Sequence, residues 1–257
     1  MKLISIFLAL LLAVPSVIAQ EKKPEKINVL VFSKTSGFRH KSISTGLKVL
    51  SDLGDERGWI ITSTENANLF TPDFLGNFDV VVFLNPSLDV LSESQQKDFE
   101  SFMAKGKGFV GIHSATDCEY DWPWYGKLIG AYFKIHPRAQ QGTVIFEDTN
   151  HPAMAPFKGM PSYRVFDEWY SFRENPRANV RVLASLDESS LDSVSLKDQR
   201  WQMKDHPIIW YQEIGNIRSF YTGYGHAPEA FLDPKIREHI GNAIDWAAKR
   251  NFAEVKK

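Results

Sequence analysis

Histidines are the residues of this chain with the widest chemical use, because a neutral imidazole binds metals and moves protons near neutral pH. The seven histidines contain no His-x-x-x-His pair, and one cysteine makes no cysteine pair, so the fold itself would have to gather a metal site. His239 lies within a predicted helix, where a structural or solvated role is expected. Five others lie at predicted strand ends, turns or loops beside glycine or proline: His40, His113, His136, His151 and His226. His136, His151 and His206 each precede a proline, a pattern also typical of extended turns, so only His136 of these three is kept as a site candidate.

His113 has the most informative position. Residues 109–112 are apolar enough for a buried strand, so His113 stands where that strand ends and the chain turns. Ligands of open parallel sheets bind at such ends, which favours a site over a buried core histidine. The stretch 111–115 resembles a nucleophile elbow in which His113 replaces the serine or cysteine, with Ser114 and Cys118 off register. Acyl transfer is therefore disfavoured, and metal binding or acid–base chemistry stays open.

Asp167 and Glu168 are the best acidic pair in the chain. They lie in a predicted strand, residues 163–170, where neighbouring side chains point to opposite faces, so only one of the two would face a site. That carboxylate would serve as a metal ligand or general base beside a cation or imidazole. The alternative is an exposed acidic pair near Arg164 or Arg173.

Strands and helices alternate in the first half of the chain. Ser42 is predicted to cap a helix, and residues 92–95 match a capping box for a second helix that runs to about Lys105 before Gly106 ends it. The apolar, β-branched segments predict strands at residues 27–33, 59–64, 79–84 and 109–112.

This alternation predicts an α/β fold, a flavodoxin-like, doubly wound and mostly parallel sheet with helices on both faces. In that order the loops after the first, third and fourth strands share one edge of the sheet. The edge would bring His40, Asn85 and His113 together.

The second half of the chain is less regular. Residues 189–205 are polar with little periodicity and predict a surface excursion. A final helix begins with Asp233 as its cap and Pro234 in its first turn. Further strands are predicted at residues 142–146, 163–170 and 180–184, with a hairpin of 208–211 and 218–222.

The N-terminus predicts a secretory signal peptide, because one lysine precedes an apolar run that is short for a membrane span and residues 17–19 suit cleavage after Ala19. An uncleaved anchor is the alternative, while the only cysteine, Cys118, lies too far along for a lipid anchor. We therefore expect export to the periplasm or outside the cell, with no stable membrane anchor. The expected organisation is a signal peptide at 1–19, a mobile leader at 20–26, a single domain at 27–250 and a tail at 251–257.

Composition points to a small neutral ligand. The formal net charge is -1, which gives no electrostatic reason to expect nucleic acid. A lone cysteine leaves the fold to be held by its core. Aromatic residues make up 13% of the chain, enough for that core, and they also suit a carbohydrate cleft.

Five motifs follow one another along the chain: Gly-Phe-Arg-His at 37–40, Gly-Phe-Val-Gly-Ile-His-Ser-Ala-Thr-Asp at 108–117, Phe-Lys-Ile-His-Pro at 133–137, Asp-Glu-Trp-Tyr at 167–170 and Thr-Gly-Tyr-Gly-His at 222–226. Together and in this order they resemble the ThuA-like (trehalose utilisation) family over about residues 27–250. The resemblance implies the fold of the class I glutamine amidotransferase-like superfamily, with His113 in place of the amidotransferase cysteine.

The resemblance also implies a role in the catabolism of trehalose and related disaccharides. Family members often stand beside oxidoreductases that make 3-keto sugars, and a metal site has been suggested for some. By matching positions, the residues that would line the pocket are His40, His113, His136, Glu168 or Asp167, and His226.

These features lead to the hypothesis of an exported sugar isomerase, lyase or hydrolase, not an amidotransferase, that acts on a keto-glycoside or keto-sugar. It would take a proton beside a carbonyl, with a divalent metal of the Zn or Mn type as the one cofactor considered. The catalytic candidates are His113, Glu168, Asp167 and His226. The metal candidates are His113, His136 and His226, and the substrate-binding candidates are Arg39, His40, Asn85, Ser114, Asp117 and Tyr170.

Two rival functions remain open. A non-catalytic carbohydrate-binding protein would keep the same pocket and bind unmodified disaccharides. A metal-dependent hydrolase of ordinary glycosides or esters would release product without prior oxidation of the sugar, but the two-carboxylate arrangement of ordinary glycosidases is not identifiable here. The sequence names neither the sugar nor an oligomeric state.

Overall fold

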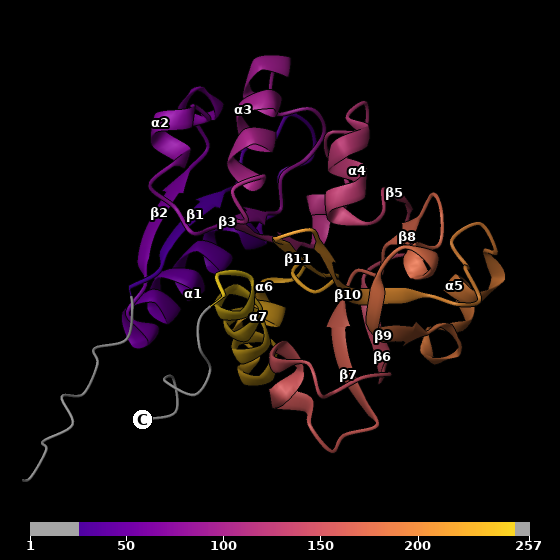
Figure 1. Cartoon of the computed structure of the whole chain (residues 1–257). Coiled ribbons are helices and arrows are strands. Elements are labelled where there is room, and N and C mark those ends of the chain that lie inside the picture. The colour runs from indigo at the N-terminus through magenta and orange to yellow at the C-terminus, as the bar shows by residue number, and fades with distance from the viewer. Residues whose placement is uncertain (1–25, 250–257) are drawn as a thin grey trace, which may run out of the picture.

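The computed structural model describes residues 26–249, which form a nine-stranded sheet with helices on both faces (Figure 1). The order across the sheet is β2-β1-β3-β4-β11-β10-β9-β6-β7. Its strands are β1 (Asn28–Phe32), β2 (Ile60–Thr64), β3 (Val80–Leu84), β4 (Gly108–Ile112), β6 (Gln140–Phe146), β7 (Ser162–Asp167), β9 (Arg181–Asp187), β10 (Pro207–Ile214) and β11 (Ile217–Thr222).

Strands β2, β1, β3, β4 and β11 are parallel, and β10, β9, β6 and β7 extend the sheet in antiparallel pairs. The order 2-1-3-4 at the parallel end is that of a flavodoxin-like fold, so the predicted α/β class is confirmed. Because the parallel strands run the same way, the loops that follow β1, β3, β4 and β11 all leave from one edge of the sheet.

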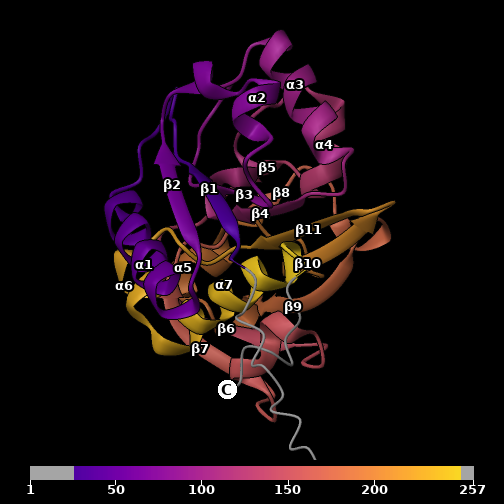
Figure 2. The same cartoon turned by 60° about the vertical axis from the view of Figure 1, so that its left-hand side comes forward.

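Helices cover both faces of the parallel half (Figures 1 and 2). The β3 and β4 strands are therefore buried along their whole length, which explains their apolar sequences. One face packs against α2 (Pro72–Leu75), α3 (Glu93–Met103) and α4 (Pro123–Ile129), and the other against α1 (Ser42–Arg57), α6 (Pro228–Leu232) and α7 (Pro234–Ala247).

Short elements fill the connections. A separate two-stranded sheet pairs β5 (Phe133–Ile135) with β8 (Ser171–Phe172). A further helix, α5, spans Ser193–Lys197. The 3-10 helices are η1 (Ala67–Leu69), η2 (His113–Thr116), η3 (Pro152–Phe157), η4 (Pro176–Ala178) and η5 (Glu188–Ser190).

Most local signals in the sequence are confirmed. Ser92 and Gln95 form the predicted capping box of α3, and Asp233 caps α7. The cap predicted for Ser42 is wrong, because its hydroxyl makes no capping bond and instead donates to the carbonyl oxygen of Gly225 at 2.7 Å. The Ser42 hydroxyl therefore binds the distant Gly225 carbonyl instead of a backbone N–H group of its own helix.

Two segment predictions need correction. The strand predicted at 163–170 ends at Asp167, and the chain turns before β8 begins. The excursion predicted at 189–205 contains α5 and a buried Trp201, whose indole N–H donates to the carbonyl oxygen of Ser195 at 2.8 Å. Leu191 and Trp201 anchor this polar segment to the core, and two apolar residues ten positions apart give no periodicity to read.

The predicted signal peptide at 1–19, the tail at 251–257 and all but the last residue of the leader at 20–26 lie outside the described residues. Among residues 26–249, no helix has both the length and the apolar character needed to cross a membrane.

Arg57 joins α1 to α7 through a nearly buried guanidinium. It donates to Asn242 Oδ1 at 3.0 Å, to Asp245 Oδ2 at 2.6 Å and to Glu238 Oε2 at 2.6 Å. The side chain of Arg57 is 8% exposed and that of Asp245 is fully buried. We expect Arg57→Met to lower the free energy of unfolding by about 3 kcal/mol, because it removes the cation beside a buried carboxylate.

Urea unfolding followed by circular dichroism measures this change. The control is Lys48→Met, which breaks an exposed ion pair with Asp52 on the same helix and should cost under about 0.5 kcal/mol. Equal losses in the two variants would show that burial of the Arg57 pair does not matter.

Candidate active site at the carboxyl edge of the sheet

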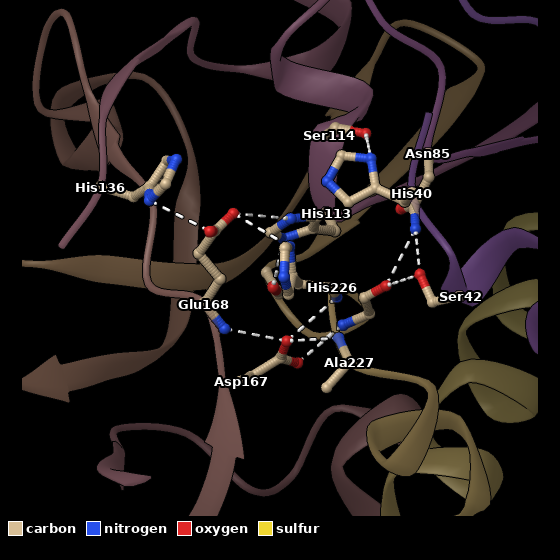
Figure 3. Close-up of polar contacts among 12 residues, drawn as sticks. His40, Ser42, Asn85, His113, Ser114, His136, Asp167, Glu168, His226 and Ala227 are labelled. Carbon is tan, nitrogen blue, oxygen red and sulfur yellow. Dashed lines mark hydrogen bonds and ion pairs between the residues drawn. The ribbon is translucent and has the colours of Figure 1, made fainter. Parts of the chain in front are cut away.

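Three histidines and a glutamate from four parts of the chain converge at the carboxyl edge of the sheet (Figure 3). His40 lies between β1 and α1, His113 opens η2 after β4, Glu168 follows β7 and His226 follows β11. Their imidazole nitrogens and carboxylate oxygen lie within 4.8 Å of one another, the one such metal-capable group among residues 26–249. We call these four residues the site cluster.

His113 occupies a strained elbow. Its φ is 46°, a left-handed value that is uncommon for residues other than glycine and that clusters at functional sites. A Cβ at Gly111 would lie 2.4 Å from Ile129 Cδ1 and 3.0 Å from Ala115 Cβ, so any larger residue before the elbow would force Ile129 to move. The Nδ1 of His113 lies 3.2 Å from the carbonyl oxygen of Gly223. Because a carbonyl only accepts, Nδ1 carries the proton and Nε2 presents a lone pair.

Each imidazole of the site cluster has one buried ring nitrogen that makes no hydrogen bond of good geometry, namely Nε2 of His40, Nε2 of His113 and Nδ1 of His226, although the last is close enough to Glu168 for an ion pair. Glu168 Oε2 lies 3.6 Å from the His113 nitrogen and 3.0 Å from the His226 nitrogen. The lone pair of His113 Nε2 therefore faces a carboxylate oxygen. Two acceptors that face each other in a buried site require a cation or a proton between them.

The charge states of His40 and Glu168 suit a metal. Burial is the main cause that lowers the pKa of His40 to about 3, and a proton on His113 or His226 acts in the same direction. Burial alone would raise the pKa of Glu168, but contacts with His113 and His226 outweigh it and hold this pKa well below its usual range. Burial opposes protonation of His226, yet the neighbouring Glu168 carboxylate raises its pKa overall. At neutral pH, His40 is a neutral imidazole and Glu168 a carboxylate, the states in which both bind metals.

A divalent metal fits these residues. Three imidazole nitrogens and one carboxylate oxygen are a donor set that zinc accepts, and imidazole with carboxylate also suits other first-row metals. One ligand atom from each of the four side chains lies within 4.8 Å of the others, and His113 is held in the ligating tautomer by the Gly223 carbonyl. His40, predicted as a substrate contact, belongs to this set, whereas the predicted ligand His136 lies outside it.

Asp167 faces away from the cluster centre and organises the loop that carries His226. Its Oδ1 accepts the backbone N–H groups of Glu168, His226 and Ala227, each at 3.0 Å, and its Oδ2 accepts that of Gly225 at 2.8 Å. The carboxylate is fully buried, and burial raises its pKa. The geometry thus gives Asp167 a positioning place and Glu168 the place in the site cluster.

Asn85 ties two loops together beneath His40. Its amide nitrogen donates to Ser42 Oγ and to the Gly225 carbonyl oxygen, both at 2.9 Å. Its φ is 50°, and its Oδ1 is buried without a hydrogen bond. The first, third and fourth strand loops do bring His40, Asn85 and His113 to one edge, as the topology predicted.

His136 and Tyr170 line one side of the cluster. The Nδ1 of His136 lies 3.1 Å from Glu168 Oε1 and 2.8 Å from the carbonyl oxygen of Pro137, so Nδ1 carries its proton. The ring of Tyr170 lies 4.1 Å from that of His113 and 5.6 Å from that of His136, centroid to centroid. Tyr170 thus packs between the two histidines.

The other predicted substrate contacts, Ser114, Asp117 and Arg39, differ in how close they lie to the site cluster. Ser114 Oγ lies 3.4 Å from His40 Nδ1. Asp117 accepts a 2.5 Å hydrogen bond from the Tyr120 hydroxyl, and burial raises its pKa. Arg39 is not brought to the cluster, because its guanidinium forms an exposed bidentate ion pair with Glu65.

Cys118 is placed for packing rather than nucleophilic attack. It is fully buried, its thiol donates to the Ala115 carbonyl oxygen at 3.3 Å, and burial raises its pKa well above the usual value. A protonated, enclosed thiol is a poor nucleophile.

The sequence did not predict that the backbone of residues 223–227 forms part of the site. Its carbonyl and N–H groups bind His113, Asn85 and Asp167, so the loop that carries His226 also holds His113 and two residues beside the site cluster. Gly225 has a φ of 126°, which favours glycine. The two glycines beside His226 in the sequence were the available signal.

Solved structures show the same fold. A ThuA-like protein from Bacteroides uniformis matches with 23% identity and a TM-score of 0.71, covering 93% of this chain and 98% of that one. One from Parabacteroides merdae matches with 19% identity and a TM-score of 0.68, covering 91% and 92%. The glutaminase domain of CTPS from Trypanosoma brucei matches with 6% identity and a TM-score of 0.50, covering 88% and 95%.

These likenesses support the amidotransferase-like fold and, at such identities, the fold alone. Comparison with curated proteins found no match. A family model described as trehalose utilisation matches residues 28–247, which connects the chain with carbohydrate metabolism and a sugar ligand. This match spans nearly all of the described residues, and the chain therefore belongs to the ThuA family.

Proposed function

We propose that this protein is a carbohydrate-catabolic enzyme that takes a proton beside the carbonyl of a keto-glycoside or keto-sugar. Family membership supports a sugar substrate. The observation that carries the chemistry is the set of three orphaned imidazole nitrogens facing one carboxylate. The apolar stretch before Ala19 supports export, and we propose that the reaction takes place outside the cytoplasm.

His40, His113 and His226, with Glu168 Oε2, would hold a divalent metal of the Zn or Mn type. When bound, such an ion supplies Lewis-acid polarisation of a carbonyl, which acidifies the neighbouring C–H bond. The chain's own residues then have to orient the sugar and accept the proton.

His136 is the residue best placed to move that proton. Its Nδ1–H is fixed by Glu168 Oε1 and the Pro137 carbonyl, which leaves the Nε2 lone pair as the base. Its side chain is 38% exposed, more than the 26% of His226 and far more than the buried His40 and His113, so a substrate can reach it. The Glu168 carboxylate would stabilise the imidazolium that forms, and the Tyr170 ring stacked at 19° holds the imidazole plane.

The reaction balances without an oxidant or reductant. The C–H bond beside the ketone breaks and its proton moves to His136 Nε2, while a carbon–carbon double bond forms. In elimination the glycosidic C–O bond breaks and the departing oxygen takes a proton from water. In isomerisation the proton returns to a neighbouring atom of the same sugar.

Proton exchange provides the test. Incubation of the full-length protein with 3-keto-trehalose in deuterated water should place deuterium beside the ketone or release the second sugar, as read by NMR. His136→Ala should slow this by about 100-fold or more, the usual contribution of a general base. His151→Ala, a histidine outside the site cluster, should leave the rate unchanged.

The rival functions give different results. Release of glucose from unmodified trehalose would show an ordinary hydrolase. Binding of trehalose with no exchange and no product from the ketone would show a carbohydrate-binding protein. Full exchange activity in His136→Ala would remove His136 as the base.

A further inference from the structure

Two exposed apolar residues, Phe38 and Leu88, come from neighbouring loops on the rim beside His40. Phe38 is 64% exposed and Leu88 is 45% exposed. They come from the loops after β1 and β3, and a Cβ at Gly37 would lie 2.8 Å from the Leu88 side chain, which places Leu88 directly over the residue before Phe38. We call Phe38 and Leu88 the rim pair.

The rim pair adjoins the site cluster directly. The ring of Phe38 meets that of His40 edge to face, with 4.8 Å between centroids and 83° between planes. His40 itself is 3% exposed and belongs to the site cluster. One aromatic side chain therefore reaches from a buried site residue to open solvent.

Backbone bonds between three loops hold the rim in place. Ser36 N–H donates to the Ser87 carbonyl oxygen at 2.9 Å, and Gly37 N–H donates to Ser87 Oγ at 3.1 Å. Leu88 N–H donates to the Asp117 carbonyl oxygen at 2.8 Å. These hydrogen bonds fix the loops that keep the rim pair exposed.

The backbone of Leu88 is held in an unusual conformation. Its φ is 56°, in the left-handed region that leucine rarely adopts. Burial of its side chain does not explain this strain, because the side chain stays exposed. Residues with such strained backbone angles are enriched at functional sites, including ligand-binding sites.

We propose that the rim pair is a subsite for the second ring of a two-ring glycoside, next to the ring that reacts in the site cluster. This inference rests on the proposed function. A pyranose has an apolar C–H face that stacks on an aromatic ring, and Phe38 offers such a face with Leu88 as its apolar neighbour. The substrate class is therefore a neutral disaccharide or aryl glycoside carrying a ketone, rather than a single keto-sugar.

The test compares two probes on the full-length protein, methyl 3-keto-glucoside with one ring and 3-keto-trehalose with two. Phe38→Ala should lower kcat/KM for the two-ring probe about tenfold and change the one-ring value less than about twofold. Phe38→Trp should restore the preference. Val194→Ala on α5, where the side chain is also 64% exposed, should change neither value.

Equal losses on both probes, or no loss on either, would overturn the subsite. If the wild-type protein turns over neither ketone, the proposed function fails by itself. Calorimetric Kd values for the same probes then decide the subsite. A two-ring preference that Phe38→Ala removes supports it, whereas no preference, or no binding of either probe, overturns it.

Discussion

His113→Ala is expected to lower metal affinity by more than about 100-fold and to abolish turnover of keto-glycosides, because it removes a ligating nitrogen rather than an outer contact. The Nε2 of His113 is buried, lacks a hydrogen bond and faces Glu168, so no other side chain of the described cluster replaces it. Elemental analysis of the purified protein, before and after loading with zinc or manganese, measures the metal. Turnover is measured on 3-keto-trehalose.

A second variant separates this effect from misfolding. His113→Asn removes the imidazole but suits the left-handed backbone, since asparagine tolerates a φ of 46° better than alanine. His151→Gln changes another buried histidine outside the site cluster and should keep the metal. Stoichiometric metal in a folded His113→Ala protein would contradict the assignment of His113 as a metal ligand. Absence of metal in the wild-type protein after loading would exclude a metal as the Lewis acid of the proposed reaction.

Asp167→Ala is expected to lower the free energy of unfolding by at least about 4 kcal/mol, because four backbone N–H groups lose their acceptor in a buried place. Asp167→Asn keeps Oδ1 for three of these groups but sets an amide N–H₂ against the N–H of Gly225. It should fold with a smaller loss, about 2 kcal/mol, and misplace His226. Urea unfolding measures both variants.

Metal affinity distinguishes positioning from simple destabilisation. In folded Asp167→Asn we expect a loss of about 10–100-fold, the usual effect of an outer-shell change. Asp192→Asn is the matched control, because Asp192 also accepts backbone N–H groups, at the start of α5. Asparagine caps helices as well as aspartate, so this control should be nearly neutral. Unchanged metal affinity in Asp167→Asn would limit Asp167 to a structural role.

Local patterns predicted the framework of the protein. The buried strands β1, β3 and β4 are continuous apolar runs, and the helix caps predicted at Ser92 and Asp233 are confirmed. The place of His113 also follows from local sequence, because the end of an apolar strand and the glycine before it define the elbow.

Long-range contacts decided the residues that the sequence misassigned. Ser42 could cap its own helix, but the fold offers it a carbonyl 183 residues away. Arg39 is adjacent to His40 in the sequence, yet its guanidinium forms an ion pair with Glu65, which follows β2. Such choices depend on which loops become neighbours, and spacing along the chain does not contain that information.

The sequence by itself determined the α/β sheet, the family and the edge at which His40, Asn85 and His113 meet, because these follow from short apolar runs and motifs. Only the tertiary structure decided which acidic residue enters the cluster. Alternation allowed one of Asp167 and Glu168, but β7 ends at Asp167, so the two-residue period stops there. Backbone N–H groups from the loop after β11 donate hydrogen bonds to the Asp167 carboxylate. Glu168 is therefore the acidic residue that faces the three histidines.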